Sequence, residues 1–242
     1  MSTAVSGAPP KPAPSAAPPA SHATPSRVRR FIGSTIGLKI VMAATGIALS
    51  LFVLIHMAGN LQVFLGAEAM DAYGAALKKL PPVLWGARIG LLAMAGAHVA
   101  AFIALTKRSR AARPVGYRRA AHRESTFASR SMRLTGPLLL AFVVYHLLHF
   151  TTGTVHPDFH EGKVYANLVT GLRVVPVALF YLLAMACLGL HLFHGVWSLF
   201  QTLGSSQPRA ESFGRKLATV FTIVVVAGFA AIPLAVLTGI LK

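Results

Sequence analysis

The stretch VVPVALFYLLAMACLGLHLFHGVWSLFQTL, residues 174–203, is apolar over almost its whole length and contains no Asp, Glu, Lys or Arg. A helix rises about 1.5 Å per residue, so this stretch is long enough to cross the roughly 30 Å hydrocarbon core of a bilayer. It nevertheless carries two imidazoles, His191 and His194. Polar side chains are costly inside a membrane, and these two therefore mark a candidate functional site.

Four more stretches are mainly apolar and long enough to cross a bilayer, and we place them at residues 36–65, 83–106, 134–154 and 214–241. The chain of 242 residues is 55% hydrophobic and only 12% charged, which is a membrane composition. A soluble helical bundle would show polar faces, and these stretches lack them. The sequence thus predicts an all-α membrane protein with five transmembrane helices.

The N-terminal segment differs in composition from the rest. The first 27 residues contain seven prolines among Ala and Ser, a mixture that buries too little apolar surface to fold. We expect residues 1–30 to be a disordered Pro/Ala-rich cytoplasmic tail and residues 31–242 to form one membrane domain. The alternative interpretation of the tail is a transit peptide, because it is poor in acids and rich in Ser.

Basic residues set the expected orientation. The stretch from Lys107 to Arg133 contains nine Lys and Arg against one carboxylate, Glu124. Other basic residues lie at or just before the starts of the first and fifth spans: Arg27, Arg29, Arg30, Lys39, Arg209, Arg215 and Lys216. The positive-inside bias then predicts a cytoplasmic N-terminus and an external C-terminus. The net charge of +17 favours binding to anionic lipid or to an acidic soluble partner. The pattern argues against nucleic acid as a partner, because the sequence shows no nucleic-acid recognition motif beside the charge.

Missing residue types exclude several chemistries. The single cysteine, Cys187, rules out Cys-x-x-Cys-His haem attachment and an iron-sulfur cluster held by this chain. No Asp or Glu lies within any predicted span. Di-iron centres in helical bundles need Glu ligands, and ion carriers usually keep a carboxylate in the membrane. A ligand that takes neutral imidazole nitrogens fits this composition better.

Histidines occur in four of the five spans, and their depths form two layers. Successive helices run in opposite directions, and each histidine lies beyond the midpoint of its own span. His56 can therefore face His146 toward the outside, while His98 can face His191 toward the cytoplasm. Two opposed imidazoles per layer suit a six-coordinate b-type haem. A zinc or copper site is the competing use, but it needs its ligands at one depth.

Four segments resemble a known family: FVLIHMAGNLQVFLG at 52–66, GAHVAAFIAL at 96–105, FVVYHLLHF at 142–150 and LHLFHGVWSLF at 190–200. Together they resemble the dihaem cytochrome b subunit of succinate dehydrogenases and fumarate reductases, the b558 family of membrane anchors. The resemblance covers about residues 31–242. It implies a five-helix dihaem cytochrome b domain in which the first four helices form the haem-binding bundle.

The resemblance also implies two haem b groups and their axial ligands, His56 with His146 and His98 with His191. His149 and His194 each lie one turn further on and are expected to support the haem or to replace their neighbours as ligands. Small residues near these positions, Gly46, Gly96 and Gly136 among them, suit either a flat ring or close helix packing.

Further implications concern partners and substrate. The chain is expected to be a non-catalytic electron-transfer subunit in a bacterial cytoplasmic membrane. A flavoprotein subunit and an iron-sulfur subunit are expected on the cytoplasmic face, and the substrate in the membrane would be a quinone, commonly menaquinone. Glu68 and Asp71, in the first external loop, are candidates for the quinone's proton route. They can equally be solvated loop charges, with Asp71 capping a short helix.

Two other functions remain compatible with the sequence. A dihaem cytochrome b of a hydrogenase or formate dehydrogenase would use the same ligands with different soluble partners. A His-lined transporter or metal permease would use the intramembrane imidazoles without haem. The direction of turnover, succinate oxidation or fumarate reduction, is left open.

Overall fold

The computed structural model describes residues 31, 33–112, 126–202 and 207–242. The expected tail at residues 1–30 and the middle of the basic stretch from Lys107 to Arg133 lie outside the described residues. Within the described part, five helical segments are long and apolar enough to span a membrane, which confirms the fold class. They are α2 (Thr35–Asn60) with η1 (Leu61–Leu65), α4 (Pro81–Ala111), α5 (Phe127–Phe150), α7 (Val175–Thr202) and α8 (Pro208–Leu237).

Helix ends differ from the expected ones where local chemistry is decisive. Helix α5 begins seven residues before the predicted 134–154 span, because the side chain of Thr126 caps it by accepting the N–H of Ser129 at 3.1 Å. It ends at Phe150, ahead of a turn that contains Gly153 at a φ of 73°. Helix α4 continues past its apolar part to Ala111, with basic side chains in its last turn, where the helix dipole favours them.

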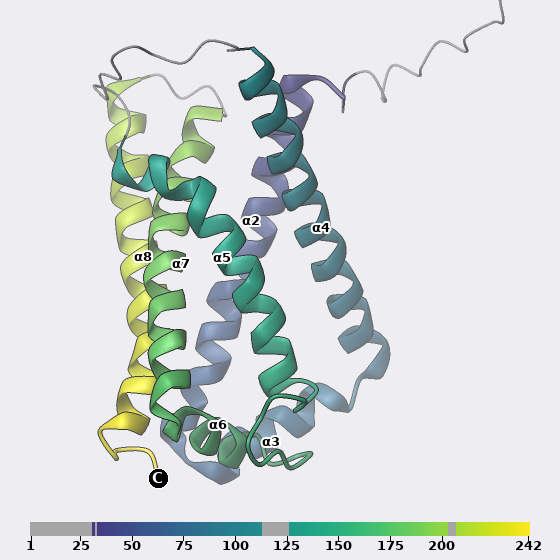
Figure 1. The fold of residues 1–242 in the computed structure, drawn as a ribbon, viewed down its shortest axis with the longest axis vertical. Helices are drawn as coiled ribbons and strands as arrows, with labels where there is room; N and C mark the ends of the chain where they lie inside the picture. The colour runs from purple at the N-terminus through teal and green to yellow at the C-terminus, as the bar shows by residue number, and fades with distance from the viewer. Residues whose placement is uncertain (1–30, 32, 113–125, 203–206) are drawn as a thin grey trace, which may run out of the picture.

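The long helices pack side by side (Figure 1). Helix α7 packs along α8 and also against α5, while α4 packs mainly against α2 at one edge of the bundle. One end of the bundle, which we call the basic end, holds the starts of α2, α5 and α8 and the ends of α4 and α7. Its basic residues among those described are Lys39, Lys107, Arg108, Arg110, Arg130, Arg133, Arg209, Arg215 and Lys216.

Two short helices, α3 (Ala67–Lys78) and α6 (Val164–Arg173), close the opposite end. Val63, Met70, Leu168 and Leu172 form a buried cluster there with residues of α7 and α8. This cluster joins the short helices to the ends of the long ones. The α3/α6 end is therefore a packed layer, and Phe150, the last residue of α5, packs against it.

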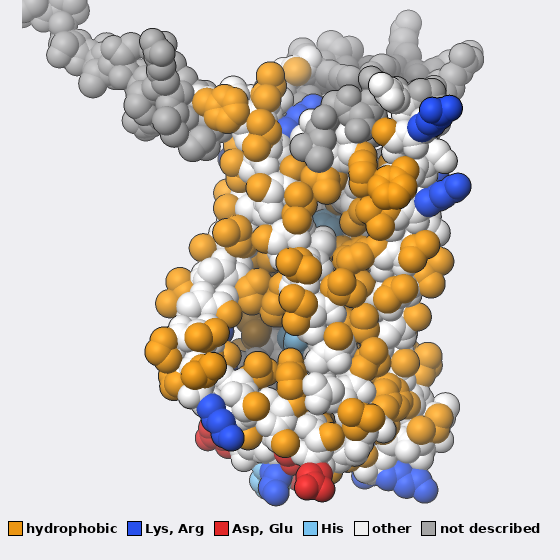
Figure 2. Space-filling view, turned by 180° about the vertical axis from the view of Figure 1, so that it is seen from behind, with side chains coloured by type: hydrophobic (Ala, Val, Ile, Leu, Met, Phe, Trp, Pro, Cys, Tyr) orange, Lys and Arg blue, Asp and Glu red, His pale blue; other side chains and the backbone are white. Residues whose placement is uncertain are grey.

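Much of the outer surface is apolar. Ile36 is 68% exposed, Leu92 75% and Leu183 61%. Figure 2 shows orange hydrophobic side chains over the middle of the molecule and charged side chains gathered toward its two ends. A water-soluble monomer rarely exposes apolar surface on this scale. Together with the five spans, this surface shows a multi-pass membrane protein.

Candidate functional site

The end of α2 and the end of α5 bring His56 and His146 together near the α3/α6 end. Their ring centres are 5.8 Å apart and their planes are nearly perpendicular, at 84°. Aromatic rings surround this outer pair: Phe52 stacks on His56 at 5.3 Å, and Phe142 lies 5.8 Å from His146. The outer pair thus lies in an apolar, aromatic environment.

Helices α4 and α7 bring His98 and His191 together nearer the basic end. Their ring centres are 6.3 Å apart, with 57° between the planes. A Cβ added at Gly46 would lie 3.6 Å from Cε1 of His98, and one at Gly136 would lie 4.0 Å from Cε1 of His191. Glycines therefore border both members of this inner pair, whereas a Cβ at Gly96 would meet nothing within 4 Å.

The separation within each pair fits two ligands on one metal. An imidazole nitrogen lies about 2 Å from a bound metal and the ring centre about 1 Å further back, so opposed imidazoles have centres about 6 Å apart. The observed 5.8 and 6.3 Å agree with this geometry. No group of three or more His, Cys, Asp or Glu in the described ranges could hold a metal ion. The ring separation in each pair is compatible with two imidazole ligands on one haem iron.

His149 lies apart from the outer pair. It is fully buried, its Nδ1 lies 2.9 Å from the hydroxyl of Tyr181, and its ring stacks on His156 at 4.9 Å. Gly171 of α6 packs so closely that an added Cβ would lie 2.8 Å from its Nε2. The structure thus presents His146 to His56 and packs His149 against α6.

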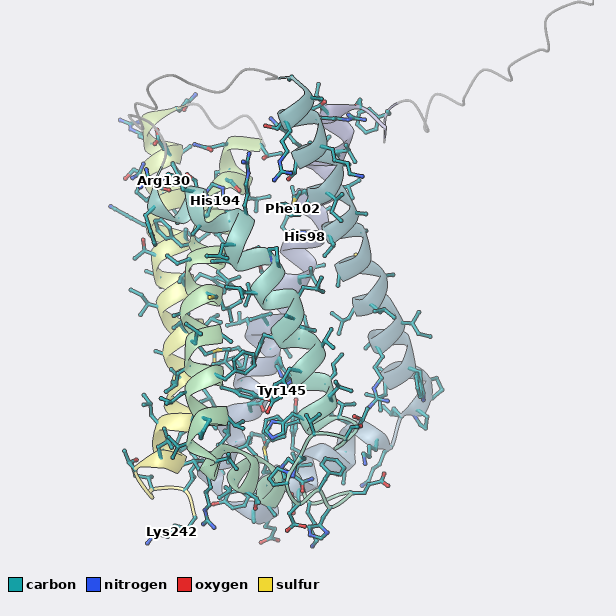
Figure 3. All side chains as sticks on the ribbon, in the orientation of Figure 1. His98, Phe102, Arg130, Tyr145, His194 and Lys242 are labelled. Atoms are coloured by element: carbon teal, nitrogen blue, oxygen red, sulfur yellow. The ribbon has the colours of Figure 1, made fainter. Side chains whose placement is uncertain are left out.

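His194 lies one turn beyond His191, toward the basic end. Its ring centre is 6.3 Å from that of Trp197, and Figure 3 shows it on α7 in the same half of the bundle as His98. Within the described residues, Nδ1 of His194 and Nε1 of Trp197 are buried without a hydrogen-bond partner. Buried polar nitrogens normally have a hydrogen-bond partner, so these two mark a place where a polar group of a ligand would fit.

The succinate dehydrogenase/fumarate reductase transmembrane subunit is a family whose model matches residues 107–231, more than half of the chain. The chain belongs to this family. It is therefore a membrane subunit of such an enzyme complex. No curated protein and no solved structure matches the chain significantly. The match to the succinate dehydrogenase/fumarate reductase family includes α5 and α7, with His146 and His191, while His56 and His98 precede it.

Both carboxylates of the predicted proton route lie on α3, the short helix in the connection between the first two spans. Glu68 is exposed in the first turn of that helix. Asp71 accepts the backbone N–H of Tyr165, the second residue of α6, at 2.9 Å. Asp71 thus caps α6 from a distant part of the chain, and a role of either residue toward quinone stays a prediction.

The sequence did not reveal four polar residues that contact the histidines, of which one is Asn60, whose amide nitrogen lies 3.3 Å from Nδ1 of His56. The hydroxyl of Thr45 lies 3.0 Å from Nδ1 of His98, and that of Tyr181 lies 3.3 Å from Nδ1 of His146. Trp197 adds its unpartnered indole N–H beside His194. The available signal was a lone Thr or Tyr in an apolar span. It does not reveal which histidine that residue contacts, because Thr45 and Tyr181 lie on other helices than the histidines they contact.

Proposed function

We propose that this chain is the membrane-anchor cytochrome b subunit of a succinate:quinone oxidoreductase. In this proposal it transfers electrons between an iron-sulfur subunit and a membrane quinone, menaquinone, through two b haems. The observation that carries the proposal is the presence of two facing imidazole pairs, at different depths of one bundle. Membership of the succinate dehydrogenase/fumarate reductase family supports it.

The residues of each pair have a defined task. When bound, each haem would supply one-electron transfer, which is favoured over oxygen chemistry if both histidines of a pair hold its iron. His56 and His146 would hold the outer haem, and His98 and His191 the inner one. The surrounding aromatic and aliphatic side chains keep water away from the imidazoles.

The orphaned donors give His194 a supporting role. Haem carries two propionate carboxylates, and a buried N–H is a suitable donor to a carboxylate. Trp197 is only 8% exposed, and the guanidinium carbon of Arg215 lies 4.8 Å from the centre of its ring. His194 and Trp197 would therefore bind propionate of the inner haem, while His191 supplies the axial nitrogen.

The two ends of the bundle have different partners in this proposal. The basic end would face the cytoplasm of a bacterium and dock the iron-sulfur subunit, which in turn carries the flavoprotein. Arg215 already pairs with Glu211 at 3.1 Å, but the basic end has far more basic than acidic groups among its described residues. The α3/α6 end, with Glu68 and Asp71, would lie outside and near the quinone.

The decisive experiment is a haem count on the purified complex. We expect the reduced absorption spectrum of bis-imidazole haem b and two haems per chain by pyridine haemochrome. His98→Ala and His146→Ala should each lower the content to one haem, because each removes one axial ligand. Succinate should reduce the haems, and a covalently flavinylated subunit should co-purify.

Matched variants one turn away test the ligand assignment. His149→Gln and His194→Gln should keep two haems, because neither ring faces the opposite member of a pair. A wild-type complex without haem would contradict the proposed function. Two haems in His98→Ala would contradict the inner ligand pair, and a nickel or molybdenum enzyme co-purifying would replace succinate dehydrogenase as the partner.

A further inference from the structure

Thr45 is a buried polar residue in the apolar helix α2, at a distance from both ends of the bundle. Its side chain is 5% exposed. Its Oγ1 lies 2.7 Å from the carbonyl oxygen of Val41 and 3.0 Å from Nδ1 of His98 on the neighbouring helix α4. Helix α2 contributes neither imidazole of the inner pair, so this contact comes from a third helix.

The hydroxyl of Thr45 has one hydrogen to donate and three polar neighbours: the carbonyl oxygens of Val41 and Met42, the latter at 3.2 Å, and Nδ1 of His98. A carbonyl oxygen can only accept, so the short contact to Val41 uses the hydroxyl hydrogen. With its hydrogen directed to a carbonyl, the hydroxyl oxygen of Thr45 can only accept at its 3.0 Å contact with His98, and we therefore assign Nδ1 of His98 as the donor. In a neutral imidazole the other nitrogen, Nε2, then carries the lone pair.

We propose that Thr45 is a positioning residue for the inner haem: it fixes His98 as the Nδ1–H tautomer and presents Nε2 as the axial ligand. This inference rests on the proposed function. A hydrogen bond from the far nitrogen makes a ligating imidazole more basic and holds its ring in one orientation. A more basic ligand stabilises ferric iron and so lowers the reduction potential of that haem.

His98 is the better oriented member of the inner pair. Within the described residues, Nδ1 of His191 is buried without a hydrogen-bond partner. Of the two imidazoles of the inner pair, only that of His98 is in contact with the Thr45 hydroxyl. The outer site lies at another depth, where Tyr181 and Asn60 are the polar neighbours of the imidazoles. Loss of the Thr45 hydroxyl should consequently change one haem and leave the other as an internal reference.

The test is a redox titration of both haems in the purified complex carrying Thr45→Val. Valine keeps the shape of threonine but cannot accept a hydrogen bond. We expect the oxidised-to-reduced ratio of the inner haem to fall about tenfold at a fixed ambient potential, an upward shift of about 59 mV for one electron. The ferric EPR signal of the inner haem should shift with it, while the outer haem stays as in the wild type.

Two variants control for packing. Thr45→Ser keeps the hydroxyl and should keep the wild-type inner potential. Thr135→Val makes the same substitution at another buried threonine, whose hydroxyl donates to the carbonyl of Ser131 at 3.2 Å, and it should not reproduce the shift.

The outcomes distinguish the role of Thr45 from the proposed function of the whole chain. An unchanged inner potential in Thr45→Val overturns the role of Thr45, whereas a selective loss of the inner haem supports it. If Thr45→Val does not fold, Thr45→Ser decides: a wild-type inner potential supports the role and a shifted one overturns it. A wild-type complex without two haems refutes the proposed function itself.

Discussion

Asp71 links α3 to α6, and replacing it distinguishes two roles: capping of α6 and transfer of protons to quinone. Its Oδ1 accepts the N–H of Tyr165 at 2.9 Å, while the residue before α6, Lys163, forms no side-chain cap. Loss of a helix N-cap costs about 0.5–2 kcal/mol, and loss of a charge at a helix N-terminus about 0.3–1 kcal/mol. Asp71→Ala loses both contributions, so we expect it to destabilise the α3/α6 end by about 1–3 kcal/mol.

Asp71→Asn is the matched variant, because its amide oxygen still accepts the N–H of Tyr165 and only the charge is lost. It should cost less than about 1 kcal/mol. Hydrogen exchange at the Tyr165 amide and thermal unfolding of the purified complex measure the two effects. Wild-type exchange at Tyr165 in Asp71→Ala would refute the capping argument.

Quinone turnover of the same two variants tests the proton route. General acid–base catalysis typically contributes about 10²–10⁴-fold to a rate. If Asp71 only caps α6, then Asp71→Asn turns over quinone almost as fast as the wild type. A hundredfold loss in Asp71→Asn with normal stability would instead assign Asp71 to the proton route.

Two glycines give further predictions. Gly46→Ala should keep both haems, since its Cβ would lie at an ordinary 3.6 Å from Cε1 of His98, whereas Gly46→Leu should lose the inner haem alone in a haemochrome count. Gly171→Ala should lower the free energy of unfolding by about 1–3 kcal/mol, because its Cβ would lie 2.8 Å from atoms of His149 and His156. The control is Gly90→Ala, whose added Cβ would meet nothing within 4 Å. Thermal unfolding of both variants checks the prediction, and equal unfolding midpoints for Gly171→Ala and Gly90→Ala would contradict it.

The sequence by itself determined the number of spans and the depth of each histidine. Both follow from one-dimensional quantities: the length of an apolar run, the position of a residue along it, and the alternation of helix direction. The two histidine layers were predictable for this reason, and the structure brings His56 to His146 and His98 to His191. The helix limits were less predictable, because caps such as Thr126 act beyond the apolar run.

Only the tertiary structure decided which of two neighbouring histidines faces its counterpart. His146 and His149 differ by 4.5 Å or so in height and by about 60° around the helix, so apolar sequence cannot choose between them. The choice depends on how α5 is rotated, and that rotation is set by packing against α6 and α7. The contact of Thr45 with His98 and the capping of α6 by Asp71 arise in the same way, since each joins residues of separate helices.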